Sequence, residues 1–115
     1  MTKLAAILVL SASCGFCNFA YSQSQPEMNA TAEAAFEKAD AKLNKIYKQT
    51  LAGLDEEGKK KLVAAERAWL AYRDAEATYE ADAERGGSIV PLIYSQTCLQ
   101  MTEARIEQLQ KSASE

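Results

Sequence analysis

Apolar residues recur every three to four positions along three stretches of the chain, which is the spacing of α-helices that each bury one face. The first stretch runs from about residue 30 to 52, with Asn29 as its predicted N-cap and Gly53 at its end. The third begins near Ser88, tolerates Pro91 in its first turn, and continues to Leu109 before a tail, residues 111–115, that we expect to fray. The spacing therefore predicts the first and third helices of the fold.

The middle stretch is bounded by Asp55, a predicted N-cap, and by Gly86-Gly87, whose conformational freedom ends helices. Its core-facing stripe is predicted to consist of Leu62, Ala65, Trp69, Tyr72, Glu76, Tyr79 and Ala83. An a/d spacing of this kind is typical of a helix that packs against two neighbours. Lys59-Lys60-Lys61 lies beside Glu56, Glu57 and Glu66, and we interpret these charges as a solvated face.

No strand pattern competes with the three helices, because Ile89-Val90 is the only β-branched cluster and is too short. The connections between the helical stretches are short, which favours antiparallel neighbours. The predicted fold class is therefore all-α, a small antiparallel three-helix bundle with a long central helix, the longest of the three.

The first 22 residues are predicted to be a signal peptide rather than part of the bundle. Met1-Thr2-Lys3 is a short positive segment, Leu4–Leu10 is apolar, and Ala20-Tyr21-Ser22 offers small residues for cleavage. The alternatives are a retained membrane anchor, which polar interruptions disfavour, and a lipid anchor at Cys14, for which the preceding residues fit poorly. We expect residues 23–115 to form one periplasmic or secreted domain without membrane insertion.

Composition fits a single soluble domain, since 48% of the 115 residues are hydrophobic and 25% are charged. Removing Lys3 with the leader lowers the basic residues from 13 to 12 against 16 acidic residues, a net charge of −4. An acidic domain disfavours nucleic acid and anionic lipid as partners and permits a basic protein.

The residue types disfavour an enzyme. The chain has no histidine, which removes the usual general base and the commonest metal ligand. Cys14 and Cys17 form a C-x-x-C only inside the leader, so Cys98 is the sole cysteine of the mature domain and lacks a base. The acids between Asp74 and Glu84 are spread around their helix without the loop spacing of a calcium site. We therefore predict no catalytic residues, no metal and no cofactor.

Glu76 occupies a predicted core position, and Arg73 lies one turn earlier on the same face. The preferred interpretation is a partly buried ion pair that fixes helix register, and the alternative is a ligand or partner site. Asp40 and Asn44 border the stripe of the first helix, where we expect them to hydrogen-bond to the second helix, with Arg73 as a candidate partner.

Five motifs in order resemble those of the LprI family, small secreted or lipid-anchored bacterial proteins named for a lysozyme inhibitor. They span residues 28–109 and read Met28-Asn29, Asp40-x-x-Leu43-Asn44-x-x-Tyr47, Ala68-Trp69-x-x-Tyr72-Arg73-Asp74-x-Glu76, Gly86-Gly87-Ser88 and Cys98-x-x-x-Thr102-x-x-Arg105-x-x-x-Leu109. The resemblance implies a helical domain in the bacterial envelope and inhibition of lysozyme. The predicted central structural cluster comprises Asp40, Asn44, Tyr47, Trp69, Tyr72, Arg73, Asp74, Glu76, Cys98, Thr102 and Arg105.

The chain departs from the family at two positions. Family members commonly carry cysteines where this chain has Thr31 and Ala77. If those cysteines form a disulfide in the family, this chain has lost both partners. Cys98 is left without a partner, and dimerisation through it is an alternative in an oxidising compartment.

The leading functional hypothesis is an exported binding protein that inhibits lysozyme by protein–protein contact. The candidate contact loop is Gly86, Gly87, Ser88 and Ile89, because glycines permit close backbone approach and Ile89 would protrude. The alternative for this loop is a plain helix–helix turn. The alternative function is a structural or accessory protein that binds another component of the bacterial envelope.

Overall fold

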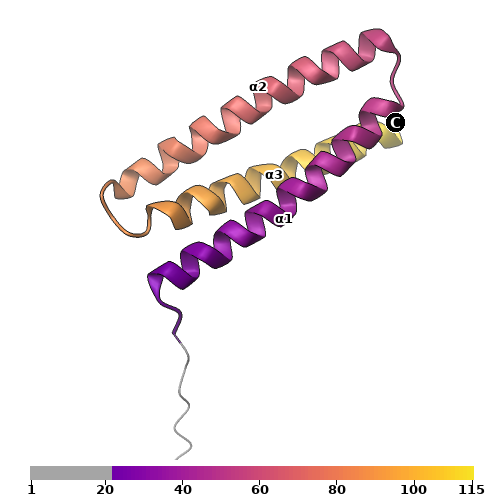
Figure 1. Cartoon of the computed structure of the whole chain (residues 1–115). Helices are drawn as coiled ribbons and strands as arrows, with labels where there is room; N and C mark the ends of the chain where they lie inside the picture. The colour runs from indigo at the N-terminus through magenta and orange to yellow at the C-terminus, as the bar shows by residue number, and fades with distance from the viewer. Residues whose placement is uncertain (1–21) are drawn as a thin grey trace, which may run out of the picture.

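The computed structural model describes residues 22–115, so the expected signal peptide lies outside the described residues apart from Ser22. Three long helices make up the described fold, each antiparallel to the next along the chain: α1 (Gln25–Ala52), α2 (Glu56–Ala81) and α3 (Val90–Ser114) (Figure 1). A single 3₁₀ turn, η1 (Asp82–Glu84), follows α2. The predicted all-α three-helix bundle is confirmed.

The first helix begins earlier than its apolar repeat predicted. Ser24, not Asn29, is the N-cap: its hydroxyl accepts a hydrogen bond from the Glu27 backbone N–H, and the Glu27 carboxylate accepts one from the Ser24 N–H. This reciprocal capping box satisfies two amides that the helix leaves unpaired. Residues 25–29, which precede the predicted start of this helix, are therefore helical.

The other helix ends are fixed by turns. Asp55 caps α2 as predicted, because its Oδ1 accepts from the Gly58 N–H at 2.8 Å. Gly86 has φ +83°, a left-handed conformation that a side chain would strain. α3 begins at Val90 rather than Ser88, and Ile89 precedes it without a side-chain cap. The tail that we expected to fray is helical through Ser114.

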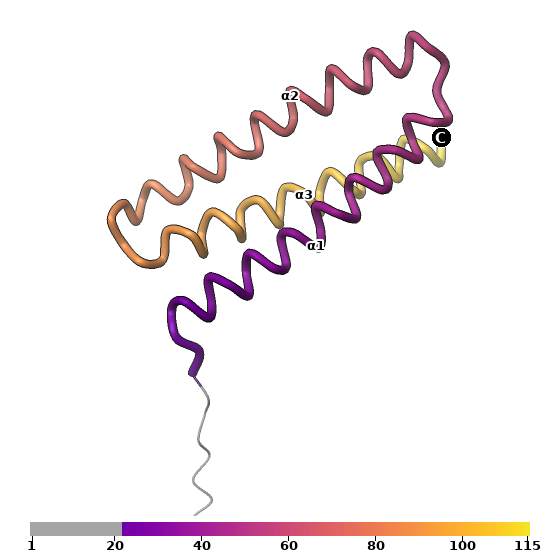
Figure 2. The backbone as a smooth tube through the Cα atoms, in the orientation of Figure 1, coloured from indigo at the N-terminus to yellow at the C-terminus, as the bar shows by residue number. Residues whose placement is uncertain are grey.

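α3 is the helix shared by the other two. It runs between α1 and α2 in Figure 2, and each of them packs mainly on it, while α1 and α2 contact each other sparsely. The prediction that the middle helix is the longest is wrong, since α1 has 28 residues and α2 has 26. The middle helix contacts both neighbours, but it packs mainly on α3. The buried positions in the first half of α3, Ser95, Cys98 and Thr102, are small enough to let two helices approach.

The buried face of α2 is rotated by about one residue, about 100°, from the predicted stripe. Its buried residues are Glu66, Arg73, Ala77 and Ala81. Four members of the predicted stripe are exposed: Ala65, Tyr72, Tyr79 and Ala83, with the two tyrosines 58% and 74% exposed. Hydropathy placed the tyrosines inside, but Glu66 and Arg73 find partners of opposite charge across the bundle and are buried instead.

The large apolar side chains are concentrated in one half of the bundle. Leu43, Ile106 and Leu109 are buried together, and Ile46, Tyr47, Leu62 and Trp69 pack against them. In the other half, around the α2–α3 connection, the buried side chains are mainly small, such as Ala32, Ala77 and Ala81. Within residues 22–115 the structure has no helix long and apolar enough to cross a membrane.

Candidate functional site

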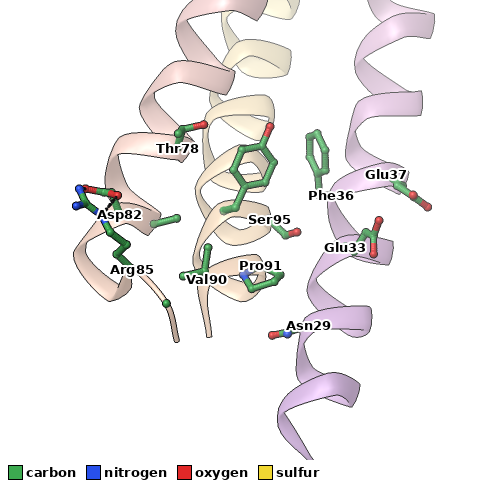
Figure 3. A pocket seen from close by; sticks show the side chains of 13 residues that line it. Asn29, Glu33, Phe36, Glu37, Thr78, Asp82, Arg85, Val90, Pro91 and Ser95 are labelled. Carbon is green, nitrogen blue, oxygen red and sulfur yellow. Dashed lines mark hydrogen bonds and ion pairs between the residues drawn. The ribbon is translucent and has the colours of Figure 1, made fainter. Parts of the chain in front are cut away.

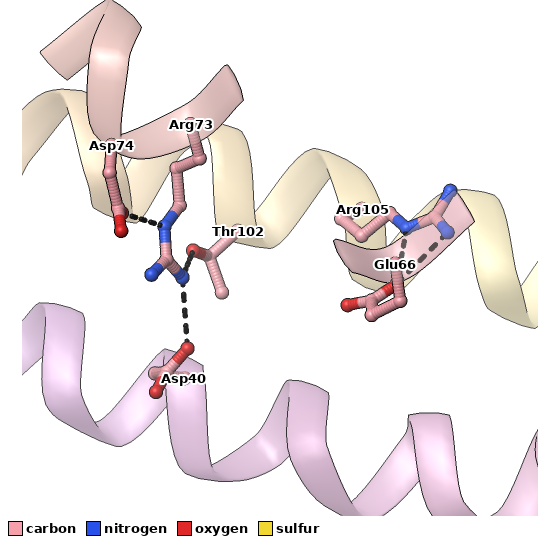
Figure 4. Close-up of polar contacts among 6 residues, drawn as sticks. All are labelled: Asp40, Glu66, Arg73, Asp74, Thr102 and Arg105. Carbon is pink, nitrogen blue, oxygen red and sulfur yellow. Dashed lines mark hydrogen bonds and ion pairs between the residues drawn. The ribbon is translucent and has the colours of Figure 1, made fainter. Parts of the chain in front are cut away.

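Arg73 links all three helices through hydrogen bonds (Figure 4). Its Nη1 donates to Asp40 Oδ1 on α1 at 2.9 Å and to Thr102 Oγ1 on α3 at 3.4 Å, and its Nε donates to Asp74 Oδ1 at 2.9 Å. Burial opposes the charge of the guanidinium, but the hydrogen bonds that Arg73 donates to the Asp40 and Asp74 carboxylates outweigh it and raise the Arg73 pKa. Arg73 therefore remains a fixed cation at the centre of the bundle.

A second ion pair lies further along the same face of α2. Arg105 Nη2 on α3 is 2.9 Å from Glu66 Oε2, and both side chains are about nine-tenths buried. Trp69 lies between the two arginines, with its ring 5.3 Å from the Arg73 guanidinium and 5.9 Å from that of Arg105. Each guanidinium thus gains a cation–π contact with the same ring.

The prediction that Glu66 belongs to a solvated face is wrong. A signal for its burial was present in the sequence, because Glu66 and Arg73 are seven residues apart and flank Trp69 on one helix face. Two opposite charges on the face of the only tryptophan indicate a buried polar seam better than an apolar stripe does.

The predicted central cluster is brought together in part. Asp40, Arg73, Asp74 and Thr102 are in contact, and Arg105 joins them through Trp69. Cys98 is fully buried, and Tyr47 packs on the core. The structure corrects three assignments: Tyr72 and Asn44 are exposed, and Glu76 is in no ion pair among the described residues.

This cluster has the properties of a structural element. Among residues 22–115, every buried polar side-chain atom has a hydrogen-bond partner, so none is left to receive a ligand. Burial raises the pKa of Cys98 and keeps its thiol protonated, and its complete burial disfavours the alternative of a dimer linked through this residue. The described residues contain no group of three potential ligands placed to hold a metal ion.

A groove of about 500 Å³ lies at the end of the bundle where α2 connects to α3. Side chains from α1, α2 and α3 line it, as Figure 3 shows. Its apolar floor is formed by Phe36, Ala81, Val90, Pro91 and Tyr94. A volume of this size accommodates one or two side chains of a partner and lies within the range of small binding sites.

The rim of the groove is acidic. Glu33 and Glu37 stand on α1, across the groove from Asp82 and Arg85 (Figure 3). Arg85 and Asp82 pair with each other through Nε–Oδ1 at 2.9 Å and Nη2–Oδ2 at 2.6 Å, and this bonding lowers the Asp82 pKa. Neither glutamate is paired with a cation among the described residues. Three carboxylates and one guanidinium give this rim a net charge of −2.

The predicted contact loop borders this groove. Gly86 lines it, Gly87 and Ser88 are exposed beside it, and Ile89 is half-buried rather than protruding. The Ser88 carbonyl accepts a hydrogen bond from Asn29 Nδ2 at 3.0 Å, which ties the loop to the first turns of α1. The role of the loop in partner binding stays a prediction.

Sequence reasoning missed the α1 and α3 walls of the groove. Neither Phe36 on α1 nor Tyr94 on α3 was identified as a candidate site residue. One sequence feature pointed to the α1 wall of the groove. Glu33 and Glu37 are like charges four residues apart, a pair that destabilises a helix by a few tenths of a kcal/mol, so their presence suggests a role other than helix stability.

Comparison with known proteins identifies the family. A family model described as lysozyme inhibitor LprI matches residues 17–109. An uncharacterised protein of Rhizobium meliloti (strain 1021) is 30% identical over 101 residues, in an alignment that covers 76% of this chain and 73% of the relative. No solved structure matches. Five motifs, a three-helix fold and a family match over most of its length together establish that this chain belongs to the LprI family.

Proposed function

We propose that this protein is exported and inhibits a lysozyme by binding it through the groove at the α2–α3 end. The observation that carries the proposal is the combination of an apolar floor with an acidic rim, in a chain of the lysozyme inhibitor LprI family. Lysozymes are typically basic proteins, so a negative groove complements them. The ordered polar cluster around Arg73 holds the three helices that form the groove and takes no part in contact.

The groove fits a lysine or arginine side chain of the partner. The aliphatic stem of such a residue would lie on Phe36 and Tyr94, and its charged head would reach Glu33 or Glu37 on the rim. Burial of the stem and contact with aromatic rings would supply most of the affinity. The rim charges would mainly raise the association rate and select a basic partner.

Inhibition by this route needs no chemistry from the protein. A bundle anchored at one end would stand over the lysozyme surface and deny a polymeric cell-wall substrate access to the cleft. The exposed Gly87 and Ser88 lie beside the groove and would be the first part of the bundle to meet the enzyme.

The experiment is a lysis assay with residues 23–115 and a basic lysozyme acting on bacterial cell walls. We expect slower lysis, with direct binding that weakens as salt rises, because screening reduces the attraction between exposed charges. No slowing at a large molar excess would refute the proposal. In that case, recovery of one endogenous protein from an envelope extract would favour the accessory envelope role instead.

A further inference from the structure

The outward face of α2 carries no charge from Ala64 to Tyr79, and Glu76 borders it one turn after Tyr72. Ala64, Ala65, Ala68, Ala71, Tyr72, Ala75 and Tyr79 are all exposed on this face. The two tyrosines are among the few large hydrophobic residues exposed on the described chain, at 58% and 74%. A solvated helix face normally carries charged side chains, so an uncharged face bearing tyrosines indicates a contact surface.

The charges of α2 are separated along its length. The first half has four basic residues, Lys59, Lys60, Lys61 and Arg67, against the acids Glu56 and Glu57, while Glu66 is neutralised by its buried pair with Arg105. Asp74, Glu76, Glu80, Asp82 and Glu84 lie in the second half and in η1. A helix that is basic at one end and acidic at the other complements a second copy of itself in the antiparallel orientation.

We infer that the outward face of α2 is a homodimer interface in which two copies pack antiparallel about a two-fold axis at Tyr72. The face is symmetric about that residue, because Ala65 and Tyr79 lie seven positions to either side. Each Tyr79 ring then packs on the small Ala65 of the second copy, and the two Tyr72 rings meet on the axis. A two-fold contact of this kind closes on itself and leads to no larger assembly.

The same register brings the opposite charges together. Lys60 and Lys61 of one copy lie opposite the segment Asp82–Glu84 of the other, at both ends of the interface, where Glu84 adds a carboxylate beyond the Asp82 that pairs with Arg85. The two grooves lie at opposite ends of such a dimer, since each groove borders the C-terminal end of its own α2. The dimer would therefore carry two separate binding grooves. The inferred interface depends only on the outward face of α2 and not on what the grooves bind.

Sedimentation equilibrium of residues 23–115 tests the interface. We expect a reversible dimer whose dissociation constant rises at least about tenfold in Tyr79→Lys, because the change removes a large contact and places charge in an uncharged seam. Gln100→Lys adds the same charge at an exposed position of α3 and should leave the dimer intact. A wild-type chain that stays monomeric up to about 1 mM would overturn the inference.

Cross-linking tests the orientation. In the proposed register Lys61 and Ala83 of different copies face each other, whereas the two Lys61 residues are about 33 Å apart at 1.5 Å per residue. A short bismaleimide should therefore join Lys61→Cys to Ala83→Cys in a mixture, and should join neither variant to itself. Self-linking of Lys61→Cys would contradict the antiparallel arrangement. The buried Cys98 provides no competing thiol.

Discussion

Arg73 and Arg105 look alike in sequence but differ in the solvation of their partners. The carboxylates that bind Arg73 are 35% and 52% exposed, so water can solvate Asp40 and Asp74 if the arginine is removed. Glu66 is only 8% exposed, so water cannot solvate its carboxylate in the same way. The cost of removing one arginine is therefore set by its partner and not by its own burial, which is similar for the two.

We predict that Arg105→Ala destabilises the fold more than Arg73→Ala. Leaving Glu66 buried without a cation should cost about 3–5 kcal/mol, whereas loss of the Arg73 hydrogen bonds should cost about 1–3 kcal/mol. Urea unfolding followed by circular dichroism measures both free energies. Arg85→Ala breaks an exposed pair and serves as the control, with no measurable change expected. The opposite order for the two buried arginines would contradict this account.

At the scale of helices, the position at which α1 begins is relevant to the proposed removal of a signal peptide. The Ser24–Glu27 capping box begins one residue after the proposed mature start at residue 23. Cleavage there would retain the complete cap, whose loss typically costs about 1 kcal/mol. The order of leader, cleavage site and cap supports the proposal that residues 1–22 are removed.

Intact mass of the protein recovered from the envelope or medium checks this prediction. We expect a mass that corresponds to a chain starting near residue 23. A mass that retains Cys14 with attached lipid would replace the secreted form with a membrane-anchored one. A mass of the full chain would argue against processing altogether.

The helices could be predicted from sequence because each has a sustained repeat bounded by Gly53, Asp55 or Gly86-Gly87. The rotation of α2 could not, because it depends on partners that lie elsewhere in the chain. Glu66 is buried because Arg105, 39 residues later, pairs with it, and Tyr79 is exposed because α2 buries the face that carries Glu66 and Arg73 instead. Hydropathy along one helix contains neither fact.

At the scale of the whole molecule, the groove results from the way the three helices share α3. Since α1 and α2 pack on α3 more than on each other, the half of the bundle without large core side chains leaves an opening between them. The sequence indicated the Gly86–Ile89 connection at this end. It did not reveal that Phe36 and Tyr94, which are 58 positions apart in the chain, would together form the floor of one groove.

Whether the groove is the binding site is tested by the affinity for lysozyme of two charge-reversed variants. Glu33→Lys/Glu37→Lys reverses the groove rim. Glu103→Lys/Glu107→Lys makes the same change at the same spacing on α3, about 12 Å or more along the helix from the groove. All four glutamates are exposed, and none is in an ion pair among the described residues, so both variants should keep the wild-type melting temperature.

We expect the groove variant to bind lysozyme at least about tenfold more weakly and the control to keep most of the affinity, because like charges placed in a contact are strongly unfavourable. Equal losses in both variants, or unchanged binding by the groove variant, would contradict the account.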